Sequence, residues 1–170
     1  MRIVPWAEEF RPAFEALNRE WLEVLFAVEP ADEAYFADPV GTILEPGGAI
    51  WFAVDRDVAA DRDVAVDREV AVGTVALIRQ PDATFELAKM GVTAAWRGRG
   101  VGRALVETAL AHAAAEGAGR VTLLSNTKLT AALRLYERLG FRRVPCPPAT
   151  GYSRCDVAME LALDGVRSVE

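Results

Sequence analysis

Cysteine and histidine are scarce in this sequence, which has two cysteines, Cys146 and Cys155, and one histidine. Two cysteines cannot make the several bridges that hold small secreted domains together, and these two do not have the spacing of zinc ligands. We therefore expect neither a disulfide framework nor a bound metal.

Positive charge and long apolar runs are also lacking. The chain has 19 lysines and arginines against 25 aspartates and glutamates, a net charge of −6. Nucleic-acid binding needs a basic footprint, so no nucleic-acid partner is expected. No run is long and apolar enough for a signal peptide or a membrane span, which predicts a cytoplasmic protein without a membrane partner.

The length of 170 residues and the hydrophobic content of 52% suit one domain, 1–170, with a substantial core. Apolar periodicity and turn residues predict a mixed α/β order with antiparallel strands first. The expected strands are 2–5, 49–54, 73–79, 84–92, 120–124, 141–144 and 155–161, and the expected helices are 10–25, a short one near 31–36, 101–116 and 129–139.

Residues 55–72 are three tandem copies of a hexamer that begins Asp-Arg. An even repeat stays in phase with the two-residue alternation of a strand, so its valines would share one face and its acidic residues the other. An extended hairpin arm fits this pattern. A duplicated surface loop fits it equally, because no Asn-Gly or Gly-Gly pair fixes a turn.

The most informative segment is 90–105, an apolar strand that enters a turn with glycines at 98, 100 and 102 and leaves as a helix. Glycines let a ligand approach the backbone, and the first amides of a helix are free to bind an anion. The spacing fails the dinucleotide fingerprint, since its third glycine falls on Arg103 or Leu105. No Lys-Ser or Lys-Thr pair completes a P-loop.

Two motifs resemble one family. The turn Arg97-Gly98-Arg99-Gly100-Val101-Gly102 resembles motif A of the GNAT superfamily of N-acyltransferases, and Leu135-Tyr136-Glu137-Arg138-Leu139-Gly140-Phe141 resembles a second segment of the same superfamily. The resemblance implies a mixed, mostly antiparallel sheet flanked by helices and splayed at the strand before the turn. It also implies transfer of acetyl from acetyl-CoA, a cosubstrate, to a primary amine of a small molecule or peptide in a ternary complex without metal.

Residues that would bind the cosubstrate follow from the resemblance. The turn and Arg103 would hold the pyrophosphate, the end of the preceding strand would line the pantetheine arm, and an asparagine after the next strand would contact CoA. In this sequence they are Met90, Gly91, Val92, Arg97, Gly98, Arg99, Gly100, Val101, Gly102, Arg103 and Asn126. The sequence departs from the family at Leu129, which takes the usual place of the asparagine, and at Ala94, where many relatives have proline.

Two residues are candidates for catalysis. Tyr136 matches the family tyrosine that acts as general acid on the departing thiolate, although the same residue would also pack on the apolar side of its helix. Glu86 stands where one branch of the family has a general base, and an apolar cleft would raise its pKa. Neutralisation by Lys89, or ordered water as the base, are the alternatives for Glu86.

The acceptor site is the least diagnostic part. The family places it between the first helices and the loop before the last strand, where the residues suit a small amine with an apolar body; these are Trp21, Phe26, Glu29, Asp32, Trp51, Tyr152 and Arg154. A non-catalytic acyl-CoA binding or sensing module is the competing class. Homodimers are common in the family, but no segment here specifies an interface.

Overall fold

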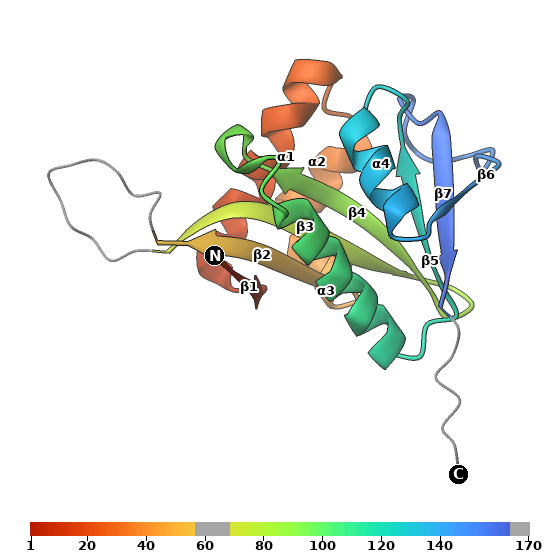
Figure 1. Ribbon diagram of the computed structural model, residues 1–170, viewed down its shortest axis with the longest axis horizontal. Helices are drawn as coiled ribbons and strands as arrows, with labels where there is room; N and C mark the ends of the chain where they lie inside the picture. The colour runs from red at the N-terminus through yellow and green to blue at the C-terminus, as the bar shows by residue number, and fades with distance from the viewer. Residues whose placement is uncertain (57–68, 164–170) are drawn as a thin grey trace, which may run out of the picture.

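A computed structural model describes residues 1–56 and 69–163. The described chain forms a seven-stranded sheet in the order β1-β2-β3-β4-β5-β7-β6. All neighbouring strands are antiparallel except β4 and β5, which are parallel (Figure 1). The strands are β1 (Arg2–Pro5), β2 (Ala49–Asp55), β3 (Val70–Gln80), β4 (Thr84–Val92), β5 (Arg120–Ser125), β6 (Arg142–Val144) and β7 (Val157–Ala162).

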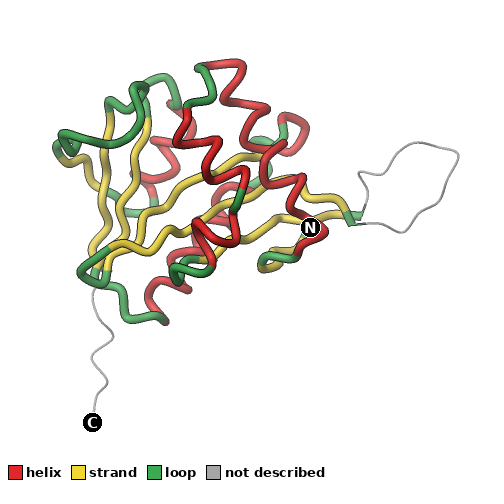
Figure 2. The backbone as a smooth tube through the Cα atoms, turned by 180° about the vertical axis from the view of Figure 1, so that it is seen from behind, coloured by secondary structure: helices red, strands yellow, loops and turns green. Residues whose placement is uncertain are grey.

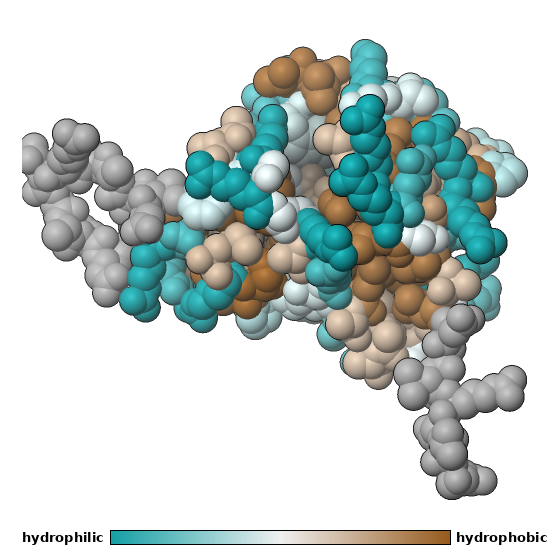
Figure 3. Space-filling view, in the orientation of Figure 1, coloured by the Kyte–Doolittle hydropathy of each residue, from teal (hydrophilic) through white to brown (hydrophobic). Residues whose placement is uncertain are grey.

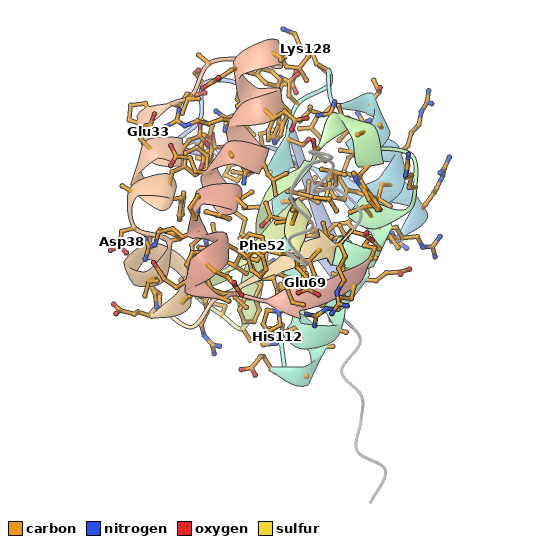
Figure 4. All side chains as sticks on the ribbon, turned by 90° about the vertical axis from the view of Figure 1, so that its left-hand side faces the viewer. Glu33, Asp38, Phe52, Glu69, His112 and Lys128 are labelled. Atoms are coloured by element: carbon orange, nitrogen blue, oxygen red, sulfur yellow. The ribbon has the colours of Figure 1, made fainter. Side chains whose placement is uncertain are left out.

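Helices cover both faces of the sheet. They are α1 (Arg11–Leu25), α2 (Pro30–Ala37), α3 (Val101–Ala115) and α4 (Thr130–Arg138), with short turns η1 (Glu8–Phe10), η2 (Val40–Leu44) and η3 (Ala94–Trp96). Figure 4 views the sheet from the side and shows α1 and α2 on one face and α3 on the other. In Figure 2, seen from behind, the helices again lie in front of and behind the strands.

Strand alternation divides the core into two clusters. On β2, Phe52 packs with Phe14 and Phe36 of the α1 and α2 layer, while its neighbours Trp51 and Ala53 pack with the α3 layer. Successive strand residues point to opposite faces, so one strand supplies both clusters. Because β2 and β3 are covered on both sides, they are apolar almost throughout, unlike strands with one face in water.

Close packing of α1 on β4 depends on Gly91. A Cβ built on this glycine would lie 2.5 Å from the carbonyl oxygen of Leu17, well inside van der Waals contact. The helix backbone therefore lies directly on the strand, and Asn18, the next residue of α1, is fully buried there. This approach places one face of α1 beside the end of β4.

The sheet opens between β4 and β5. The two strands pair over Thr84–Glu86 and Arg120–Thr122, and in the described chain no further pairing joins them, although β5 stays paired with β7 as far as Ser125. Just beyond the last pair, β4 carries a bulge in which Lys89 and Met90 stand opposite one residue of β3. Lys89 has φ +52°, a left-handed conformation that breaks the ladder and bends the strand. The predicted splay is confirmed.

Most predicted elements are confirmed with one or both ends shifted by one to three residues, and 2–5 and 84–92 match β1 and β4 at both ends. The short turns η1, η2 and η3 were not predicted. Of the hexamer repeat, Asp55 pairs with Val70 across β2 and β3, and residues 57–68, on which the choice between hairpin arm and loop depends, lie outside the described residues. In the described chain, no helix is long and apolar enough to cross a membrane.

Candidate functional site

The splay opens into a cavity of about 650 Å³ that extends from the glycine turn to α2 and the loop before β7. Its lining includes both predicted catalytic residues, Tyr136 and Glu86, and every predicted cosubstrate residue except Arg99. Figure 3 shows this face of the molecule, with the end of α1, where Val24 and Leu25 are exposed, as a hydrophobic cap at the top. The sequence motifs thus meet in one place.

The glycine turn is shaped by two residues with positive φ, Gly98 at +73° and Gly100 at +81°. A Cβ built on either would meet no described atom within 4 Å, so conformation rather than crowding calls for glycine. The first hydrogen bond within α3 runs from the Ala104 amide to the Gly100 oxygen, 3.0 Å. The amides of 101–103 therefore lack an acceptor within the helix and, with its dipole, can bind an anion.

Arg97 holds this turn in place. Its Nε donates to the carbonyl oxygen of Val92 at 2.9 Å, and Nη2 donates to Glu20 at 3.3 Å. Glu20 also accepts the Ala94 amide at 2.8 Å, which fixes the segment before the turn to α1. The guanidinium of Arg97 therefore organises the loop while one side of the residue lines the cavity.

The other two arginines of the turn lie further out. Arg99 places its guanidinium over the Trp96 ring, 5.1 Å from the centroid, outside the cavity lining. Arg103 is exposed, lines the cavity and pairs with Glu107 at 2.8 Å, one turn along α3. An exposed pair of this kind is weak, so Arg103 can exchange it for a bound phosphate.

Two buried polar atoms of α1 have no partner among the described residues. Asn18 Oδ1 and Trp21 Nε1 have no hydrogen bond to any described residue, although Asn18 Nδ2 donates to the Phe14 oxygen at 2.9 Å. Both residues line the cavity opposite the end of β4. Leaving a buried acceptor and a buried donor unpaired costs stability, which is typical of a place that a polar ligand completes.

Tyr136 of α4 lies across the splay from β4. Its ring is 6% exposed and packs on Phe141, 5.7 Å between centroids, while its hydroxyl approaches the Met90 sulfur at 3.9 Å. Burial raises the pKa of the Tyr136 phenol, which keeps it protonated at neutral pH. The predicted packing role and an acid role are thus both compatible with its position.

Glu86 lies on β4 and lines the cavity. Burial raises the pKa of its carboxyl, and the nearby charge of Lys89 partly opposes that rise. Its single hydrogen bond to a described residue comes from Gln80 Nε2, at 3.3 Å. A carboxyl with a raised pKa and a single hydrogen bond is a better base than an ordinary glutamate.

A buried ionic cluster closes the far end of the cavity. Asp32, with no exposed surface, accepts Lys89 Nζ at 2.6 Å and two hydrogen bonds of 2.8 Å from Arg154. Lys89 also donates to the Tyr152 hydroxyl at 2.9 Å. Although burial favours protonation, the donors from Arg154 and Lys89 bring the pKa of Asp32 below its usual value, so the carboxyl is ionised. Lys89 thus pairs with Asp32 rather than with Glu86.

Lys89 as an acceptor-side residue was missed by the sequence analysis. Of the predicted acceptor residues, four line the cavity, namely Trp21, Asp32, Tyr152 and Arg154. Glu29 lies behind them and accepts from Ser153 and Arg154. The placement of Trp51 in the acceptor pocket is wrong, because β2 turns this ring into the α3 layer, 5.1 Å from the His112 ring (Figure 4 labels His112).

Asn126 lines the cavity with both ends of its amide engaged. Nδ2 donates to the Arg154 oxygen at 2.6 Å, and Oδ1 accepts the Lys128 amide at 2.8 Å. The side chain therefore joins the end of β5 to the loop that carries Arg154. Clusters of three or more His, Cys, Asp or Glu side chains that could hold a metal do not occur in the described part of the chain.

A mixed sheet that splays beside a glycine turn and a buried tyrosine is the GNAT architecture. Residues 46–143 match the family model described as an acetyltransferase (GNAT) domain. The chain belongs to the GNAT acetyltransferase family.

Relatives of known name cover parts of the chain. It is 33% identical over 129 residues to human (Homo sapiens) N-acetylaspartate synthetase, which covers 74% of this chain and 36% of that protein. It is 45% identical over 58 residues to mycothiol acetyltransferase of Streptosporangium roseum, which covers 34% of this chain and 17% of the relative. The chain thus spans about a third of the length of the first relative.

Solved structures support the fold along almost the whole chain. A GNAT-family acetyltransferase of Staphylococcus aureus superposes with a TM-score of 0.81 at 17% identity, covering 95% of this chain and 98% of the other. A phosphinothricin acetyltransferase of Sinorhizobium meliloti, in complex with AcCoA, gives a TM-score of 0.73 at 19% identity, covering 97% and 90%. At such identities the likeness concerns the fold alone.

Proposed function

We propose that this protein transfers an acetyl group from acetyl-CoA to a primary amine of a small molecule or peptide by direct attack within a ternary complex. The observation that carries the proposal is that the free amides of the glycine turn, Tyr136 and Glu86 line one cavity at the splay. We assign residues 1–170 to one N-acetyltransferase domain, with the hexamer repeat of 55–72 as an insertion or hairpin arm within it.

Each part of acetyl-CoA has a matching surface. The amides of 101–103 and the exposed Arg103 suit the pyrophosphate. The end of β4, Met90–Val92, pairs with β3 but has no partner on its β5 side, and this free edge suits the pantetheine arm. This arrangement would bring the thioester to the region of Met90 and Tyr136.

The proposed reaction conserves every proton. Glu86, directly or through water, takes a proton from the acceptor ammonium, and the neutral nitrogen attacks the thioester carbonyl carbon. The carbon–sulfur bond breaks, its electron pair stays on sulfur, and Tyr136 gives its proton to the thiolate. The proton shed by the acylated nitrogen restores the phenol, so the products are the amide, CoA and one proton released to water.

The name of a relative indicates one class of amine acceptor. The name of the human relative states that its product is N-acetylaspartate, an amino acid acetylated on its amine. The amine of an amino acid therefore falls within the proposed class of acceptors.

Release of the CoA thiol tests the function. The protein is incubated with acetyl-CoA and a panel of primary amines, amino acids and short peptides, and free thiol and acetylated product are measured against reactions without acceptor. We expect thiol and product in equal amounts with at least one acceptor class. Tight acetyl-CoA binding with no product from any amine would instead indicate an acyl-CoA binding or sensing module.

A further inference from the structure

The acceptor end of the cavity is built around Arg154. Its Nη1 donates to Glu29 at 3.2 Å and to Asp32 at 2.8 Å, and its Nη2 donates to Asp32 at 2.8 Å. The guanidinium lies over the Tyr152 ring, 4.5 Å from the centroid, which fixes its plane. The side chain is 14% exposed, so this arginine is held rigidly at the cavity wall.

A guanidinium has two edges that can bind a carboxylate with two parallel hydrogen bonds. Asp32 occupies the edge formed by Nη1 and Nη2. The other edge, formed by Nε and the second Nη2 proton, has no acceptor among residues 1–56 and 69–163. Arg154 therefore offers one complete, unoccupied fork.

Tyr152 adds a further donor beside this fork. Its hydroxyl oxygen accepts Lys89 Nζ, so its own proton is free, and no described residue accepts it. Burial raises the pKa of the Tyr152 phenol, so the proton stays on at neutral pH. Unpaired hydrogen-bond donors of Arg154 and Tyr152 thus lie close together at this end of the cavity, and they suit a ligand with several hydrogen-bond-accepting oxygens.

The complementary group lies along β4. Glu86 is the carboxyl of the same cavity that no described cation pairs with, since Lys89 binds Asp32. Arg154 and Tyr152 have hydrogen-bond donors that no described residue uses, which suits a carboxylate. Glu86 has a carboxyl without a cationic partner, which suits an ammonium. Together they define a ligand with one carboxylate and one ammonium.

We infer that the acceptor is an amino acid whose carboxylate binds the Nε and Nη2 edge of Arg154 and the Tyr152 hydroxyl while its amine lies toward Glu86. This inference rests on the proposed acetyl transfer and names its substrate class. Arg154 and Tyr152 are specificity-determining residues under it, and the Asp32 carboxylate positions Arg154.

Charge supports this choice over a polycationic acceptor. Two cations, Lys89 and Arg154, are balanced by Asp32 and Glu29, so the cluster as a whole is neutral. Glu86 of the same cavity can balance one ammonium, so the second ammonium of a polyamine would add uncompensated positive charge beside two buried cations, which is costly where water is scarce. In a zwitterionic amino acid the ammonium has Glu86 as its partner and the carboxylate has Arg154.

Matched acceptors test the inference. Each of several L-amino acids is compared with its carboxamide and with the amine that lacks the carboxyl group, for example leucine, leucinamide and isopentylamine. For the wild-type protein we expect kcat/KM to be about 10- to 100-fold higher for the amino acid, as charge-assisted paired hydrogen bonds provide. The same ligands are titrated calorimetrically in the presence of CoA, which gives binding without turnover.

Two variants locate the effect. Arg154→Lys keeps a positive charge beside Asp32 but loses the second edge, so KM for the amino acid should rise about tenfold, and by a larger factor than KM for the carboxamide. Tyr152→Phe should reduce the preference by a smaller factor and leaves the ion pairs in place. Arg142→Lys, at an exposed position of β6 outside the cavity, is the control and should retain the preference.

The outcomes separate the two proposals. Equal or better use of carboxamides by the wild type, or a preference that survives in Arg154→Lys and Tyr152→Phe, overturns the inference and leaves acetyl transfer standing. Amino-acid binding in the presence of CoA that depends on Arg154, without acetylation of any amine, overturns the proposed activity and supports the carboxylate site. Absence of both binding and turnover overturns both.

Discussion

The hydroxyl of Tyr136 on α4 meets the sulfur of Met90 on β4 at 3.9 Å, and this contact bridges the splay. A sulfur atom is a weak acceptor, so the phenol has a proton but no strong partner among the described residues. The contact thereby brings the motif that contains Tyr136 against β4, the strand that precedes the glycine turn.

Tyr136→Phe should lower kcat by about 100-fold, the usual contribution of a positioned acid, with little change in KM for acetyl-CoA. The phenylalanine ring keeps the contact with Phe141 and loses only the hydroxyl, so the melting temperature should stay close to that of the wild type. Steady-state thiol release and thermal melting check both halves. An unchanged kcat would reduce Tyr136 to a packing residue.

Glu86→Gln should remove a step from the pH profile. Since burial raises the pKa of Glu86, and since a base works when deprotonated, the wild-type rate should rise with pH through a value above that of an ordinary glutamate. The glutamine variant should lose that limb and about 10- to 100-fold in kcat. Glu116→Gln, at an exposed position after α3, is the control and should keep the wild-type profile. A retained limb in Glu86→Gln would favour water as the base.

The same variant should be more stable than the wild type at neutral pH. A carboxyl whose folded-state pKa is raised contributes stability below its unfolded pKa and loses that contribution as pH rises through the folded pKa. Glutamine stays neutral throughout, so urea unfolding at pH 7 should show a higher midpoint and at pH 4 a smaller difference. Lower activity with higher stability is typical of a functional carboxyl.

Gly102→Ala should separate binding from folding. A Cβ at this position would lie 3.5 Å from Leu135, an ordinary contact, and alanine favours a helix by up to about 1 kcal/mol over glycine. The melting temperature should therefore stay at the wild-type value or rise. Calorimetry with acetyl-CoA should show about tenfold weaker binding, because the methyl group occupies the anion site of the glycine turn. Gly119→Ala, where a Cβ meets no described atom within 4 Å, should leave binding intact. Unaltered binding in Gly102→Ala would place the pyrophosphate elsewhere.

Local signals made most of this predictable. Gly98 and Gly100 have positive φ, a conformation that the glycines themselves predict. The apolar alternation of 84–92 predicts both ends of β4. Lys89 was not predictable in the same way, because its contact with Asp32 joins residues 57 apart in the chain. That contact depends on the left-handed bulge at Lys89 and on where α2 packs, and neither leaves a local pattern.

Trp51 shows the opposite failure. Trp51 is an aromatic residue close in sequence to the predicted acceptor region, which suggested a pocket residue. In a strand, however, neighbouring side chains point to opposite faces of the sheet. Register decides which face, and the pairing of β2 with β1 and β3 sends Phe52 toward α1 and Trp51 toward α3. One residue along the chain thus separates the two layers.

Asp32→Asn should be among the most damaging single changes in the acceptor region. The carboxyl is fully buried and accepts from Lys89 and Arg154, so its removal leaves buried cations short of a partner, at a cost of about 3–5 kcal/mol in unfolding free energy. Glu33→Gln on the same helix breaks an exposed pair with Arg19 and should cost less than about 1 kcal/mol.

The pair Asp32–Lys89 can be tested by a double-mutant cycle with Lys89→Met. Asp32→Asn leaves the Lys89 cation without its partner, and Lys89→Met removes that cation. The double variant should therefore lose at least about 1 kcal/mol less unfolding free energy than the sum of the two single losses. The pKa of Asp32 is lowered in the folded state, so its contribution is present above the unfolded pKa of aspartate and falls away as pH drops through the folded value. Urea unfolding from pH 7 to pH 3 should therefore show the gap between wild type and Asp32→Asn narrowing in acid, and a constant gap or additive losses would contradict the ion pair.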